Sequence, residues 1–107
     1  MPQPNKIAYK FEARVRHTDG SVEPFKVEIT EPTGSKKIDG ERECRVYSSM
    51  DMADDVVIYS PDDTQTLRNA VYFMKCFLRH GEDVLIDEDG REVELPRPDP
   101  WPDDLRA

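Results

Sequence analysis

Residues 60–81 read SPDDTQTLRNAVYFMKCFLRHG and predict an amphipathic helix from Pro61 to about Arg79. Ser60 is a favourable N-cap, and Pro61 suits the first helical position because its missing N–H has no partner there anyway. Gly81 follows the last turn as the expected C-cap. Apolar side chains at intervals of three and four residues form one stripe, which consists of Leu67, Ala70, Val71, Met74, Phe77 and Leu78.

Alternating apolar and polar residues predict strands on both sides of this helix. A hairpin begins the chain, with a first strand over 7–15, a turn at 17–21 that contains Asp19-Gly20, and a second strand that ends near Ile29. Pro24 indicates a bulge or an edge position in the second strand, because proline cannot donate to the ladder. The other predicted segments are a polar loop over 31–42, strands over 43–50 and 55–59 joined by a loop at 50–54, and a final hairpin formed by 83–87 and 91–95.

This order of elements predicts an α+β fold: an antiparallel sheet of about five or six strands, with one amphipathic helix packed on one face. We expect residues 6–95 to form a single domain. Residues 96–107 contain alternating prolines and predict an extended C-terminal tail. Its tryptophan, Trp101, either docks back on the domain or anchors a partner, and we expect docking.

Acidic residues are concentrated in the second half of the chain. Residues 1–50 contain 9 Lys and Arg against 8 Asp and Glu, whereas residues 51–107 contain 6 against 15. With a formal net charge of −8, such a chain repels nucleic acid and anionic membranes and attracts basic surfaces. No apolar run approaches the roughly 20 residues of a membrane span. The polar segment 1–5 is not followed by the apolar core of a signal peptide. We therefore expect a cytoplasmic protein with reduced cysteines.

No motif in the sequence predicts catalysis or a bound metal. Cys76 and His80 are four residues apart on the helix, but two ligands do not make a zinc site. The Asp-Gly pair at 89–90 fits a hairpin turn better than a calcium loop. His17 is a possible general base, although a histidine beside a turn is usually a surface residue. We therefore expect no catalytic residue, no metal and no cofactor.

The helix start also carries a family resemblance. Residues 62–70, DDTQTLRNA, resemble the D-x-x-Q-A-L-x-x-A signature of a family of small bacterial proteins of unknown function, with Thr66 in place of the alanine. The order of elements is similar over most of residues 7–96, including a strand that carries Cys44. In such a family Asp62 and Gln65 would cap the helix and face solvent, so the resemblance implies no catalytic residue. The resemblance also implies a gene position near toxin or phage-defence genes.

We therefore predict a non-enzymatic acidic binding protein of inhibitor or immunity type, which presents carboxylates to a basic protein surface such as that of a nuclease or defence complex. One alternative is a housekeeping α+β domain that self-associates through a sheet edge. Another is a small enzyme whose site forms only at an oligomer interface. The candidate electrostatic residues are Asp62, Asp63, Asp87, Glu88 and Asp89, and the candidate aromatic anchors are Tyr47, Tyr59, Tyr72 and Trp101.

Overall fold

The computed structural model describes residues 6–50 and 56–96. Most of the predicted loop at 50–54 and the tail from residue 97 onward, with Trp101, lie outside the described residues. The elements in chain order are strands β1 (Ile7–Arg16), β2 (Val22–Thr30), β3 (Thr33–Gly34), β4 (Arg42–Ser48) and β5 (Val56–Ser60), helix α1 (Asp63–His80), and strand β6 (Val84–Ile86).

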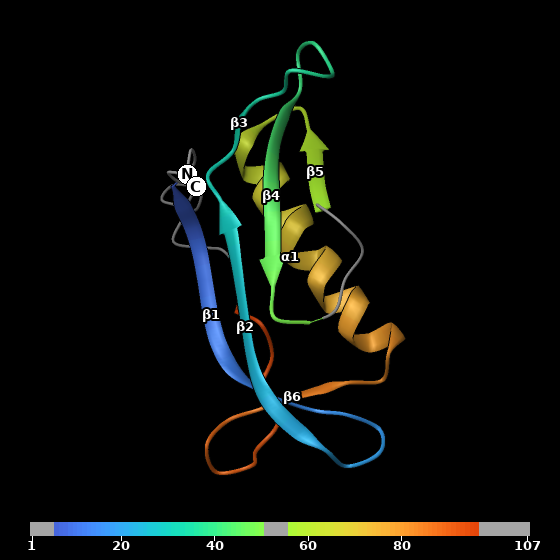
Figure 1. Ribbon diagram of the computed structural model, residues 1–107. Helices are drawn as coiled ribbons and strands as arrows, with labels where there is room; N and C mark the ends of the chain where they lie inside the picture. Colours follow the sequence, from blue (N-terminus) through green and yellow to red (C-terminus); the bar gives the residue numbers. More distant parts are fainter. Residues whose placement is uncertain (1–5, 51–55, 97–107) are drawn as a thin grey trace.

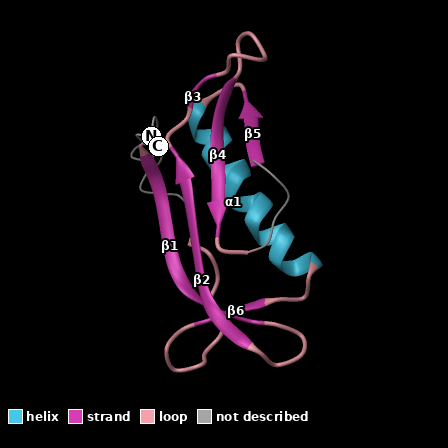
Figure 2. Cartoon of the chain, viewed as in Figure 1, coloured by secondary structure: helices cyan, strands magenta, loops and turns pink. Residues whose placement is uncertain are grey.

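The strands form one antiparallel six-stranded sheet, and α1 packs on one of its faces (Figure 1). The predicted α+β class is therefore confirmed. The long β1–β2 hairpin lies in the middle, β6 pairs with the outer edge of β1, and β4 pairs with β2. Val46 pairs with Ile29 of β2 and with Val56 of β5, so β2 and β5 lie on opposite edges of β4. Figure 2 shows the single helix against this sheet.

One hydrophobic core joins the sheet and the helix. The strands direct alternate side chains inward, because successive side chains of a strand point to opposite faces. The helix turns its apolar stripe toward them. The core side chains are Val15, Phe25, Val27, Ile29, Cys44, Val46, Leu67, Ala70, Val71, Met74, Leu78, Leu85 and Leu95. Since Leu95 belongs to this core, the segment after β6 is part of the domain.

The start of the helix differs from the prediction. The N-cap is Asp62, whose carboxylate accepts a hydrogen bond from the backbone N–H of Gln65 at 2.8 Å. Ser60 instead ends β5, where it pairs with Arg42, and Pro61 precedes the cap. Pairing in the sheet holds Ser60 in a strand and leaves capping to the aspartate two residues later, as the family resemblance implied.

Phe77 is only partly buried, although the apolar stripe placed it in the core. It packs at the margin of the core beside Phe73, with ring centroids 6.3 Å apart. Thr66, which the apolar stripe does not include, is fully buried. Its hydroxyl donates to the carbonyl oxygen of Asp62 at 2.7 Å, which removes the cost of burying an unpaired hydroxyl.

Three smaller predictions about the strands were wrong in part. Pro24 pairs with Arg14 without a bulge, and the register shift of this hairpin lies between Ile7 and Tyr9. The alternative of an edge position is right, because β4 pairs with β2 only at Val27–Ile29 and no described strand pairs with Pro24 on that side. The predicted loop over 31–42 contains the short strand β3. The second arm of the last hairpin is not a regular strand: it makes an isolated bridge between Ile86 and Glu92, and the backbone N–H of Val93 donates to the carbonyl oxygen of Leu85 at 2.9 Å.

Over the part of the chain that is described, no helix has the length and apolar character that a bilayer crossing requires.

Candidate functional site

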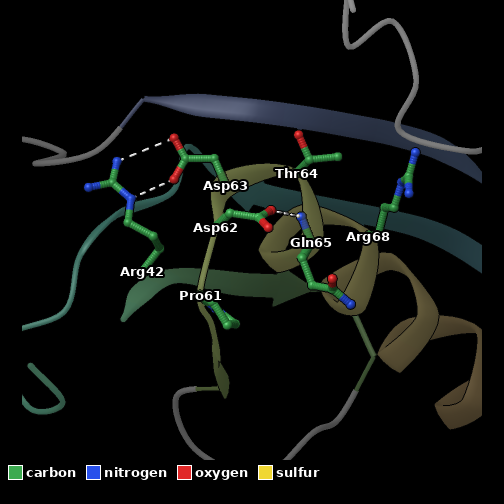
Figure 3. Close-up of a pocket in the computed structure, with 7 residues that line it drawn as sticks. All are labelled: Arg42, Pro61, Asp62, Asp63, Thr64, Gln65 and Arg68. Carbon is green, nitrogen blue, oxygen red and sulfur yellow. Dashed lines mark hydrogen bonds and ion pairs between the residues drawn. The ribbon is translucent and has the colours of Figure 1, made fainter. Parts of the chain in front are cut away.

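An open hollow of about 610 Å³ lies beside the start of the helix (Figure 3). The carboxylate of Asp63 binds the guanidinium of Arg42 through two contacts, Oδ1 to Nε at 2.5 Å and Oδ2 to Nη2 at 3.3 Å. Asp62 is the N-cap. Arg68 lines the same hollow. Arg42 therefore pairs with Asp63, and Arg68 adds a second positive charge to the lining of the hollow, so the candidate carboxylates at this end of the helix are partly compensated.

The turn after β6 contains the second predicted acidic cluster. Asp87 organises it, since its carboxylate accepts hydrogen bonds from the backbone N–H groups of Asp89 at 2.8 Å and Arg91 at 2.9 Å. Gly90 adopts a φ of +84°, which favours glycine. Glu88 and Asp89 are exposed at the tip of the turn. The side chain of Arg14 binds this turn only through the backbone carbonyl of Glu88, at 3.1 Å.

The two acidic clusters lie at opposite ends of the molecule (Figure 1). Asp62 and Asp63 stand at the start of α1, which has 18 residues and is therefore about 27 Å long. The turn that carries Asp87, Glu88 and Asp89 follows β6, beyond the other end of the helix. The clusters do not converge, and of the two only the turn after β6 leaves carboxylates free of partners among the described residues.

The candidate tyrosines do not form one patch. Tyr47 on β4 and Tyr59 on β5 share the sheet face opposite α1, because their neighbours Val46 and Ile58 point into the core. Tyr72 lies on the outward face of the helix and is 63% exposed. Trp101 lies outside the described residues. A single partner surface would contact either the sheet face or the helix.

The structure adds a cluster that the sequence did not predict, centred on His17. Its Nδ1 lies 2.8 Å from Oδ1 of Asp83, and its Nε2 lies 2.5 Å from Oε2 of Glu23. Hydrogen bonds to Asp83 and then to Glu23 raise the pKa of His17 above its ordinary value of 6.5. Asp83 is 66 residues away in the chain, so no local pattern could have paired it with His17.

We call the contacts of His17 with Asp83 and Glu23 the His17 clasp, because they link two separate segments of the chain. Both ring nitrogens of His17 contact carboxylates, which favours the doubly protonated imidazolium and leaves no lone pair for a general base. An adjoining hollow of about 310 Å³ is lined by Met50, Phe77, His80 and Gly81 besides the cluster. None of these residues is a serine, threonine or cysteine that His17 could activate. The role that this geometry supports is structural: through Asp83, His17 joins the first hairpin to the segment after α1.

The two cysteines lie in different environments. Cys44 is buried on β4, where burial, and to a lesser degree Glu43, raises its thiol pKa to about 12. Cys76 is a partly buried free thiol on α1. Within residues 6–50 and 56–96 no three His, Cys, Asp or Glu side chains are grouped closely enough to hold a metal ion.

Comparison with known proteins gave no relative from which a function could be transferred: no family model, no curated protein and no solved structure matches this chain. The resemblance of residues 62–70 to a bacterial family stays a prediction.

Proposed function

We propose that this chain is a non-enzymatic acidic binding protein that acts in the cytosol and recognises a basic protein surface through the turn after β6. The observation that carries the proposal is the state of the carboxylates in the two acidic clusters. Asp62 and Asp63 are engaged by the helix N-terminus and by Arg42, whereas the side chains of Glu88 and Asp89 are exposed at the tip of a hydrogen-bonded turn. A partner is therefore expected at the turn and not at the helix start.

The turn is suited to electrostatic recognition because its backbone is already arranged. Asp87 holds it through two hydrogen bonds from backbone N–H groups, and Arg14 binds it from β1. A preorganised loop loses little conformational entropy on binding. Exposed carboxylates mainly accelerate the encounter with a cationic partner, and salt screens this effect. An inhibitor or immunity protein for a cationic enzyme, such as a nuclease, has these properties.

The experiment begins with capture of partners from a lysate of the native host by the tagged full-length protein. The captured partner is purified and its association kinetics are measured at low and at physiological salt. The turn variant combines Asp87→Asn, Glu88→Gln and Asp89→Asn. The amide introduced at position 87 keeps an oxygen that can accept the turn's hydrogen bonds. The matched control, Glu31→Gln with Asp39→Asn and Glu41→Gln, removes the same number of charges from the loop between β2 and β4.

We expect the turn variant to associate roughly tenfold more slowly at low salt, with less effect at physiological salt. The control variant should associate at nearly the wild-type rate, although its net charge is the same as that of the turn variant. Equal slowing of both variants would assign the effect to overall charge. That result, or the capture of no basic protein, would contradict the proposal.

A further inference from the structure

Strand β5 forms one edge of the sheet. It pairs with β4 from Val46–Val56 to Arg42–Ser60, and no other described strand pairs with it. In an antiparallel strand, alternate residues direct their N–H and C=O groups away from the partner. Among the described residues, no backbone hydrogen bond outside the regular helix and strands involves residues 56–60. Among residues 6–50 and 56–96, the outer row of donors and acceptors on β5 therefore has no strand paired with it.

The composition of β5 does not protect this edge. The strand reads VVIYS, with three β-branched aliphatic residues, one tyrosine and no charged residue or proline. Edge strands of monomeric proteins are usually blunted by lysine, proline, an inward-pointing charge or a bulge. The register of β5 on β4 runs without a shift over all five pairs. The strand has both the sequence and the regular geometry of one that pairs on both sides.

The opposite edge of the sheet, formed by β6, is better protected against pairing with another strand. Strand β6 has only three residues and lies between Asp83 and Asp87. Beyond β6, the outer strand β1 carries the exposed charged residues Lys10 and Glu12. Both features discourage pairing between edges. The two edges of this sheet therefore differ in kind, and β5 is the unprotected one.

The helix contributes apolar surface on the side of β5. Lys75 and Arg79 line a hollow shared with β6 and Leu95, so that flank of α1 faces the β6 side of the sheet. The partly buried Phe73 and Phe77 lie on the other flank, where Phe77 lines a hollow with His17 and Met50. Helix α1 also packs against β5. The helix begins beyond the end of β5 and crosses behind β4 (Figure 1).

We propose that the outer edge of β5 is a homodimer interface, in which β5 pairs antiparallel with β5 of a second copy of this chain. The partner is a second copy because antiparallel pairing of a strand with itself is twofold symmetric and needs only one kind of surface. A twofold axis at Ile58, the middle residue of β5, places Val57 of one copy opposite Tyr59 of the other. Two chains of net charge −8 meet there along uncharged strands.

The size of this interface sets the strength of the dimer. Five paired residues span about 17 Å, and such a strip alone buries less than the roughly 1,200 Å² of a stable interface. A reversible, concentration-dependent dimer follows. It is independent of the turn after β6, which lies on the opposite side of the sheet, so either proposal can fail without the other.

The experiment measures the mass of the full chain by analytical ultracentrifugation over a wide range of concentrations. A lysine variant, Val57→Lys with Tyr59→Lys, places like charges opposite each other across the twofold axis. A glutamate variant, Val57→Glu with Tyr59→Glu, does the same with the opposite sign. The matched control is Tyr47→Lys, on the same sheet face but on the interior strand β4. Circular dichroism checks that each variant is folded.

We expect the wild type and the Tyr47→Lys control to dimerise, and each double variant to dissociate roughly tenfold more readily. An equimolar mixture of the lysine and glutamate variants should recover the dimer, because opposite charges then face each other. Hydrogen exchange of the wild type gives a test without mutation: the amides of residues 56–60 should exchange more slowly at high concentration than at low. A wild type that stays monomeric, or a dimer that both double variants leave unchanged, would overturn the proposal.

Discussion

Nδ1 of His17 lies 2.8 Å from the carboxylate of Asp83, and this contact joins the end of the first hairpin to the segment between α1 and β6. Glu23, one strand away, holds the other ring nitrogen. Gly81 ends the helix, and Glu82 follows with a φ of +59°, a conformation that is unusual for a residue other than glycine. The contact between His17 and Asp83 ties down the chain where it leaves the helix.

This clasp predicts a pH dependence of stability. The pKa of His17 in the folded protein is raised above 6.5 by Asp83 and then by Glu23. The stabilisation should therefore be fully present below that ordinary value and be lost as the pH rises through the folded-state pKa. We expect the difference in unfolding free energy between the wild type and His17→Gln to shrink as the pH rises from about 5.5 to about 9.

Urea denaturation at several pH values measures this difference. His80→Gln is the control, because His80 lines the same hollow but its side chain makes no hydrogen bond or ion pair with another described residue. The His80→Gln difference shows how much of any pH dependence comes from removing a histidine that makes no ion pair. A His17→Gln difference that is constant over the same range, or that grows with pH, would contradict the clasp.

The helix cap gives a second prediction, with two neighbouring residues as mutual controls. Asp62→Ala should destabilise the protein by about 0.5–2 kcal/mol, because Asp62 accepts the hydrogen bond from Gln65. Ser60→Ala should be neutral or stabilising, since the buried hydroxyl of Ser60 has no hydrogen-bond partner among the described residues. Chemical denaturation of both variants decides between the two caps. A larger loss for Ser60→Ala would restore the cap that the sequence pattern predicts.

The two core positions of the helix should respond differently to truncation. Met74 is fully buried at the centre of the helix face, so Met74→Ala should cost about 2–5 kcal/mol. Phe77 lies at the margin of the core, and Phe77→Ala should cost less than Met74→Ala despite the larger side chain removed. Thermal or urea unfolding measures both variants. The reverse order would mean that Phe77 is more deeply packed than the structure shows.

Thiol reactivity gives a fourth prediction. Cys44 is 1% exposed, and burial raises its pKa to about 12, so at neutral pH it is neither accessible nor ionised. Cys76 is partly exposed on the helix. We expect a thiol-specific reagent to modify one cysteine in the folded protein and the second only after denaturant is added. The variant Cys76→Ser should lose the first reaction. Equal rates for both thiols in the folded state would contradict the packing of β4 under the helix.

Local patterns in the sequence determined the elements and the fold class. The apolar stripe through Leu67 and Met74 predicts the helix, and Asp19-Gly20 predicts the first hairpin, because helix periodicity and turn chemistry act over a few residues. The family resemblance implied Asp62 as a cap, whereas Pro61 at the first helical position favoured Ser60. Pairing of Ser60 with Arg42 in the sheet decided between them, and that pairing is a long-range property.

Only the tertiary structure decided which charged residues meet. Sequence position could not show that Asp63 binds Arg42, or that Asp83 binds His17, because these contacts depend on the order of strands in the sheet. The same order separates the two acidic clusters and leaves β5 at an unprotected edge. Hydrophobic periodicity and turn residues act over short stretches of sequence, so helices, strands and turns can be predicted from a single sequence. Ion pairs and strand neighbours are set by how those elements pack against one another, which no short stretch of the sequence contains.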